Sequence, residues 1–133
     1  MTRHHLFNPE GMPPAIGFSY GAIAERGRTM HIAGLTGHDV SGAIDDGIVE
    51  QFGAACHSVA RVIAEAGGQP GDLVSMVIYT SSIYEYRANL RPIGMAYRSV
   101  FGDHYPPMAL IGVSELFDPR AVVELVCVAV VPE

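Results

Sequence analysis

Apolar and polar residues alternate in two short stretches near the N-terminus, residues 18–24 and 29–36, and this period predicts two β-strands. A polar turn at 25–28 lies between them, so we expect the two strands to pair as a hairpin. The preceding residues, 8–17, contain an asparagine, glycines and three prolines, a composition typical of an ordered loop.

A helical period begins at Ile48. The apolar residues that recur at steps of three and four are Ile48, Phe52, Ala55, Val59, Val62 and Ala66. The polar residues expected on the opposite face are Glu50, Gln51, Ser58, Arg61 and Glu65. This pattern predicts an amphipathic helix that starts after an N-cap at Asp45 or Asp46 and ends at Gly67 and Gly68.

The second half of the chain alternates between strand and helix patterns. Residues 72–82 predict a buried strand, residues 84–101 a second helix, and residues 108–114 and 121–131 two further strands. The residues of this second helix expected to face inward are Tyr86, Leu90, Ile93, Tyr97 and Val100. Pro92 has no backbone N–H, so we expect it to kink this helix or to start a second piece.

The order of these elements predicts one α+β domain over residues 1–133, with a mixed sheet and two helices packed on one of its faces. The other face of such a sheet needs a cover, and self-association is the simplest one. An apolar content of 49% agrees with a buried subunit interface, although a full core explains it equally well.

Charge narrows the classes of partner. The chain carries 14 acidic against 8 basic residues, a net charge of −6, which disfavours a nucleic-acid partner because binding there needs a basic surface. All eight basic residues are arginine. The absence of lysine excludes mechanisms that use a lysine Schiff base, a pyridoxal-phosphate anchor or a P-loop lysine.

Two cysteines, Cys56 and Cys127, fit no metal-binding spacing and are expected to be buried structural thiols. The N-terminus lacks the apolar core of a secretion signal, and no apolar run is long enough to span a bilayer. We therefore expect a cytoplasmic protein without a membrane partner.

Several histidines, three arginines and one glycine are further candidates for functional groups, but few of them point to a specific chemistry. The histidine pairs His4–His5 and His31–His38 do not converge, so we expect no metal site. Arg87, Arg91 and Arg98 share one face of the second helix, where they either grip carboxylates or form a solvated surface. Gly34 ends a strand, and a glycine there lets a ligand approach the backbone closely.

Six motifs in order resemble one family. They are NPEG, AIGFSYGA, AGLTG, MVIYTSS, FGDHYPPM and VELVCVAVV, and they span nearly the whole chain. Together they resemble the Rid family, the YjgF/UK-type proteins also named L-PSP ribonucleases. The resemblance implies a chorismate-mutase-like α+β fold, a homotrimer, and small-molecule clefts at the subunit interfaces. It further implies hydrolysis of 2-imino and enamine acids to keto acids and ammonia without a cofactor.

The site residues implied by this resemblance match only in part. Gly34 falls on the family's backbone donor and Asn89 on the asparagine of the second helix. Met108 occupies the place of the arginine that binds the substrate carboxylate, and Val126 that of the glutamate that positions water. The family's first-strand tyrosine falls on Ser19, with Tyr20 one residue later.

Loss of the arginine removes a bidentate grip on a carboxylate, so we expect weak activity on 2-imino acids. We then expect either an altered enzyme, which hydrolyses a less acidic enamine or imine, or a non-catalytic trimer that binds a small ligand or acts as a chaperone. The polar groups expected beside the cleft are Gly34, Asn89, Tyr20, His104, Tyr105, Glu115 and Arg120, of which Arg120 is also a candidate replacement for the missing arginine.

Overall fold

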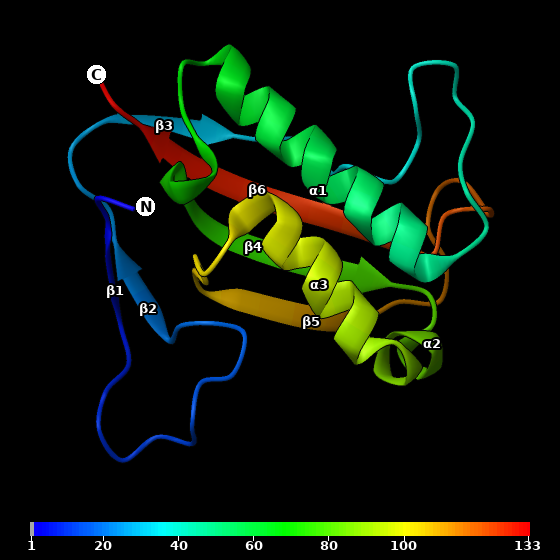
Figure 1. Cartoon of the computed structure of the whole chain (residues 1–133), viewed down its shortest axis with the longest axis horizontal. Helices are drawn as coiled ribbons and strands as arrows, with labels where there is room; N and C mark the ends of the chain where they lie inside the picture. Colours follow the sequence, from blue (N-terminus) through cyan, green and yellow to red (C-terminus); the bar gives the residue numbers. More distant parts are fainter. Residues whose placement is uncertain (1) are drawn as a thin grey trace.

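A four-stranded mixed sheet forms the centre of the structure, a computed structural model that describes residues 2–133 (Figure 1). Its strands, in order across the sheet, are β3 (Arg28–His31), β6 (Val123–Val131), β4 (Leu73–Thr80) and β5 (Met108–Gly112). β6 pairs antiparallel with both β3 and β4, and β4 pairs parallel with β5. The two central strands, β4 and β6, are rich in β-branched residues, which suit a pleated surface buried on one side.

Two helices cover one face of this sheet, as Figure 1 shows: α1 (Ile48–Glu65) and α3 (Leu90–Phe101). Two short pieces complete the chain's helices, α2 (Ile83–Ala88) and the 3-10 turn η1 (Pro70–Asp72). Side chains alternate along β6, so that Val123, Leu125 and Cys127 are buried under the helices while Glu124 and Val126 point to the opposite face. The predicted α+β fold, with helices on one face of a mixed sheet, is confirmed.

The core face of α1 agrees with the apolar period, apart from one polar residue. Phe52, Ala55 and Val59 are fully buried, and the predicted start at Ile48 and the end before Gly67 are confirmed. Gln51 was expected on the outer face but is completely buried. Its side-chain amide makes three hydrogen bonds to backbone groups, and these bonds offset the cost of burying a polar group. The expected aspartate N-cap is also wrong: the N-cap is Gly47, and no side chain caps the helix.

The second helix is divided in two, as Pro92 indicated. α2 ends and α3 begins at Asn89, which places Pro92 in the first turn of α3. A missing N–H has no consequence there, because the first N–H groups of a helix have no partner within it. Ile93 and Tyr97 face the core as predicted, whereas Leu90 was expected inward and is 59% exposed.

The predicted N-terminal hairpin is wrong. β2 (Gly21–Ile23) pairs antiparallel with β1 (His5–Phe7) in a separate two-stranded sheet, and β3 pairs with β6 instead. The ring of Phe7 lies directly over Gly21, where any side chain would collide with it. β6 offers β3 a long apolar partner from the far end of the chain, and pairing with this buried strand overrides the local turn signal.

The buried His104 lies between α3 and β5. Its Nε2–H donates to the carbonyl oxygen of Leu73 (2.7 Å), and among residues 2–133 its Nδ1 is the only buried side-chain nitrogen or oxygen without a hydrogen-bond partner. Burial lowers the pKa of His104 below its usual 6.5. The folded protein therefore holds this imidazole neutral.

Acid should destabilise the fold through His104. Below pH 6.5 the unfolded chain binds a proton at this residue and the folded chain resists it, so the free energy of unfolding falls as the pH falls. His104→Gln keeps a donor for Leu73 but cannot titrate. Between pH 7.5 and 5.5, urea unfolding should show a decrease smaller by about 1 kcal/mol in this variant than in the wild type. A His104→Gln variant with the same pH dependence as the wild type would refute the assignment.

Candidate functional site

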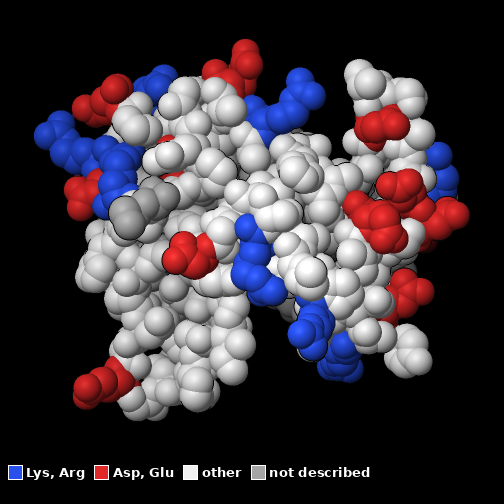
Figure 2. All heavy atoms as spheres, in the orientation of Figure 1, with Lys and Arg blue, Asp and Glu red and all other residues white. Residues whose placement is uncertain are grey.

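A largely apolar cleft of about 680 Å³ lies between α3, β5 and the segment 16–18. The residues that line it are Ile16, Gly17, Phe18, Phe52, Ile78, Tyr86, Leu90, Ile93, Gly94, Tyr97, Arg98, Tyr105, Met108, Ala109 and Leu110. Figure 2 shows this side of the molecule, where a notch separates the lobe of the N-terminal segment from the helices and basic side chains lie beside it. We call this space the α3–β5 cleft.

The cleft exists because β5 is an edge strand that the helices cover incompletely. Met108 pairs with Met76 in the parallel ladder and so points toward the helical layer, as does Leu110 two residues later. Leu110 is 42% exposed although it lies on this core-facing side. On α3, Leu90, Gly94 and Tyr97 form the facing wall at helical spacing.

Three of the predicted site residues meet at one end of the cleft. Ser19 is buried, and its hydroxyl donates to the carbonyl oxygen of Tyr105 (2.6 Å). The Tyr105 ring stacks on Tyr97, with centroids 5.4 Å apart and planes inclined by 16°. Met108 follows on the same wall and is half-buried. Ser19 is thus a support for the loop before β5, whereas Tyr105 and Met108 face the cleft directly.

Asn89 and Tyr20 border the cleft, but their side chains serve the local backbone. The Asn89 amide donates to the carbonyl oxygen of Glu85 (2.8 Å) at the end of α2. The Tyr20 hydroxyl donates to the carbonyl oxygen of Pro13 (2.8 Å), and its ring lies edge-on to Phe18, which lines the cleft. Both residues therefore shape the neighbourhood of the cleft without lining it.

Gly34 lies on the opposite side of the sheet. Leu35 bridges to Leu125, so Gly34 lies next to Glu124 and Val126 on the face away from the helices. The carboxylate of Glu124 is so close to Gly34 that a side chain at this position would collide with it. Among residues 2–133, neither the Gly34 N–H nor the Glu124 carboxylate has a hydrogen-bond partner.

The register separates Met108 and Val126, two of the positions at which the family resemblance fails. Met76 pairs with both Met108 and Cys127, so these three share the helix-covered face, and Val126 points the other way. Positions 108 and 126 of one chain cannot line the same site. A site that uses both positions requires a second copy of the chain.

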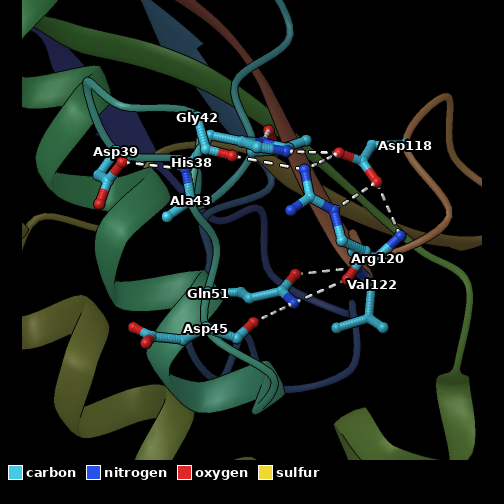
Figure 3. Close-up of polar contacts among 10 residues, drawn as sticks. His38, Asp39, Gly42, Ala43, Asp45, Gln51, Asp118, Arg120 and Val122 are labelled. Carbon is cyan, nitrogen blue, oxygen red and sulfur yellow. Dashed lines mark hydrogen bonds and ion pairs between the residues drawn. The ribbon is translucent and has the colours of Figure 1, made fainter.

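Arg120 belongs to a polar network that joins the loops 36–46 and 113–122 (Figure 3). Its guanidinium donates to both carboxylate oxygens of Asp118 (2.7 and 3.2 Å) and to the carbonyl oxygen of Gly42 (3.4 Å). His38 Nε2–H also donates to Asp118 (2.8 Å), and His38 Nδ1 accepts from the Thr36 hydroxyl (2.5 Å). The Arg120 contacts hold the pKa of Asp118 far below its usual range. This arginine is already occupied, which disfavours it as a substitute anion anchor.

Gln51 links the same loops to α1, as Figure 3 also shows. Its amide nitrogen donates to the carbonyl oxygens of Asp45 (2.7 Å) and Arg120 (3.0 Å), and its amide oxygen accepts from the Val122 N–H (2.9 Å). Glu115 lies in the 113–122 loop, is exposed, and lines neither the α3–β5 cleft nor the shallower space beside His38 and His57.

The cysteines are buried, as predicted. Burial raises the pKa of Cys127 to about 12 and that of Cys56 further still, so neither thiol is a nucleophile. Within the part of the chain that the structure describes, no three metal-ligating side chains form a group. No helix among residues 2–133 has both the length and the apolar character needed to cross a bilayer.

Comparison with known proteins agrees with this fold. The family model described as Endoribonuclease L-PSP matches residues 11–131. The chain belongs to this family. A Rid-family protein of Yersinia pestis, YyfB, is 27% identical, with a TM-score of 0.86 over 98% of this chain and 100% of that one. No curated protein sequence matches the chain.

Two further relatives support the same architecture. A member of the YjgF/YER057c/UK114 family from Mycobacterium tuberculosis is 25% identical, with a TM-score of 0.65 over 96% of this chain and 99% of the other. A RidA protein from the Antarctic bacterium Psychrobacter is 19% identical, with a TM-score of 0.69 over 96% and 99% of the two chains, and shares the fold.

Sequence reasoning missed Arg98 as a cleft residue and Thr36, His38 and Asp118 as a network. Arg98 was grouped with Arg87 and Arg91 on one helix face, yet of these three only Arg98 lines the cleft. The available signal was its spacing of four residues from Gly94, which leaves space on the same helix face. The His38–Asp118 contact joins residues 80 positions apart, and no local sequence pattern predicts it.

Gln51 should contribute strongly to stability. Gln51→Leu keeps a similar volume but leaves two carbonyl oxygens and one N–H, all partly buried, without their partner, so we expect a loss of about 2–3 kcal/mol in the free energy of unfolding. Urea denaturation measures it. Glu65→Leu, at the exposed end of the same helix, should change stability by less than about 0.5 kcal/mol. A loss for Gln51→Leu as small as that of the control would show that the link is dispensable.

Proposed function

We propose that this chain forms a homotrimer with small-molecule clefts at its subunit interfaces, and that it hydrolyses an enamine or imine that is less acidic than a 2-imino acid. The α3–β5 cleft is the single observation that carries this proposal. It has the volume and apolar lining of a site for a small organic molecule, and position 108 lies in its wall. The surrounding fold is that of the family to which the chain belongs.

The face of the sheet away from the helices supports the assembly. Its apolar residues, all partly exposed in the single chain, are Val77, Ala109, Ile111, Val126 and Val128. These apolar residues share the face with the polar Glu124, and a second copy of the chain would supply a complementary cover for them. Such contact would also bring Glu124 and Gly34 of one subunit toward the cleft of its neighbour.

The proposed reaction needs little machinery. Water adds to the C=N carbon, the resulting carbinolamine loses ammonia, and a carbonyl compound remains, so one C=N bond is exchanged for C=O without a cofactor. The free Gly34 N–H is suited to hold a polar group of the substrate, and the unpaired Glu124 carboxylate is suited to orient the water. Glu124 shares its strand face with Val126, the position of the family's glutamate.

A non-catalytic role is the second candidate, and the lining of the cleft favours it. Only one charged side chain, that of Arg98, lies among the lining residues. A site of this kind is suited to retain an apolar ligand or an exposed peptide segment, as a binding or chaperone-like protein would. Ribonuclease activity is a weaker proposal because the acidic balance and the absence of lysine leave RNA little to bind. The two buried free thiols are compatible with a cytoplasmic location.

Turnover of 2-iminobutanoate, generated in situ by an amino-acid oxidase, should be weak. Met108 offers no charge to its carboxylate, so the wild type should accelerate its loss less than about 10-fold over buffer, whereas Met108→Arg combined with Val126→Glu should accelerate it further. A neutral imine with an unsubstituted nitrogen should be hydrolysed faster by the wild type than by Glu124→Gln. Rapid wild-type turnover of 2-iminobutanoate would contradict the expected weakness of that activity, and no turnover of any imine would favour the binding role.

Assembly can be tested independently of activity. Light scattering should give a mass about three times the 14.2 kDa of one chain. Val126→Arg, a charge in the middle of the apolar sheet face, should shift the protein toward monomers, whereas Arg61→Glu on the outer face of α1 should leave the mass unchanged. A monomeric wild type at micromolar concentration would remove the proposed interface.

A further inference from the structure

Arg98 is the one charged residue in the lining of the α3–β5 cleft, and it has no partner. Within residues 2–133, its guanidinium makes no ion pair and no hydrogen bond. No acidic residue lines the cleft to neutralise it. A guanidinium held at the edge of an apolar space is available to an anion, because it is weakly hydrated and presents two parallel N–H donors.

A glycine one turn earlier in α3 allows this guanidinium to lie close to the helix. Arg98 follows Gly94 by one helical turn, and its Nη1 lies 3.2 Å from the point that a Cβ on Gly94 would occupy. Gly94 itself lines the cleft, so its missing side chain leaves room for the arginine to lie along the wall. A larger residue at 94 would push the guanidinium away from this position.

Arg98 and Met108 belong to opposite walls. Met108 and Leu110 come from β5, whereas Arg98, Gly94 and Tyr97 come from α3. Position 108, where the resemblance predicts an arginine, is uncharged, and the guanidinium of Arg98 lies on the facing wall. An anion bound by Arg98 would therefore lie at the α3 wall, which sets a different length and orientation for the ligand.

We propose that Arg98 binds the anionic group of an amphipathic monocarboxylate whose apolar or aromatic body fills the α3–β5 cleft. The rings of Phe18, Tyr97 and Tyr105 supply apolar contacts for that body. This inference rests on the proposed function only in that the same cleft would hold the substrate. It narrows the ligand class to molecules long enough to place a carboxylate at α3 while their other end faces β5.

The test compares a carboxylate with its neutral amide. NMR titration of the full-length protein with 3-phenylpropanoate and with 3-phenylpropanamide should give binding at least about 10-fold tighter for the carboxylate, equal to about 1.4 kcal/mol. Arg98→Gln should remove this preference, and Arg98→Lys should retain part of it. Added salt should weaken binding of the carboxylate alone.

Arg91→Gln is the matched control, because Arg91 lies on the same helix but outside the cleft lining. It should keep the wild-type preference. Leu110→Glu, on the facing wall that contacts the apolar body, should weaken binding of both probes and that of the carboxylate more. Equal affinities for the two probes, an unchanged preference in Arg98→Gln, or no carboxylate binding up to about 10 mM would each overturn the proposal.

The outcome separates this inference from the proposed function. A wild type that prefers the carboxylate through Arg98 but turns over no imine supports the anion site and refutes the enzyme. A wild type and Arg98→Gln that hydrolyse a neutral imine equally, without any preference for the carboxylate, refute the anion site and leave the enzyme in place.

Discussion

Two helices cover a four-stranded sheet from one side only, and the other features of the molecule depend on this coverage. The central strands β4 and β6 bury one face beneath α1 and α3 and leave the opposite face apolar and partly exposed. At the edge, β5 extends beyond the helices, so its core-facing side chains line a cleft instead of a core. The cleft and the uncovered apolar residues therefore arise from the same incomplete cover.

The alternation of side chains along the strands divides the candidate chemistry between the two faces. Met108 and Tyr105 belong to the cleft, whereas Gly34 and Glu124 belong to the free face. Under the proposed function, a single chain thus carries two incomplete halves of a site. Assembly through the free face would combine the cleft of one subunit with the polar groups of another, which is a physical reason for function to depend on the oligomer.

The proposed anchor at Arg98 changes the interpretation of the methionine at position 108. An arginine there would bring a charge to the β5 wall, and Met108 makes this wall apolar and adaptable. Arg98 supplies a charge from the α3 wall, where Gly94 leaves room for it. With this proposed anchor, the cleft would keep an affinity for anions but would not fit the short ligands that an arginine on β5 would hold.

The sequence by itself determined the elements whose signals are local: α1 and its ends, the break in the second helix before Pro92, the strands β4, β5 and β6, and the buried cysteines. The order of the motifs also identified the family, and with it Met108 and Gly34 as positions that match the family's site. Only the tertiary structure decided the pairing of β3 with β6, the burial of Gln51, the contact of His38 with Asp118, and the place of Arg98 in the cleft. Each of these joins residues distant in the chain or depends on which helix face meets a cavity, and neither is encoded in a local period of apolar residues.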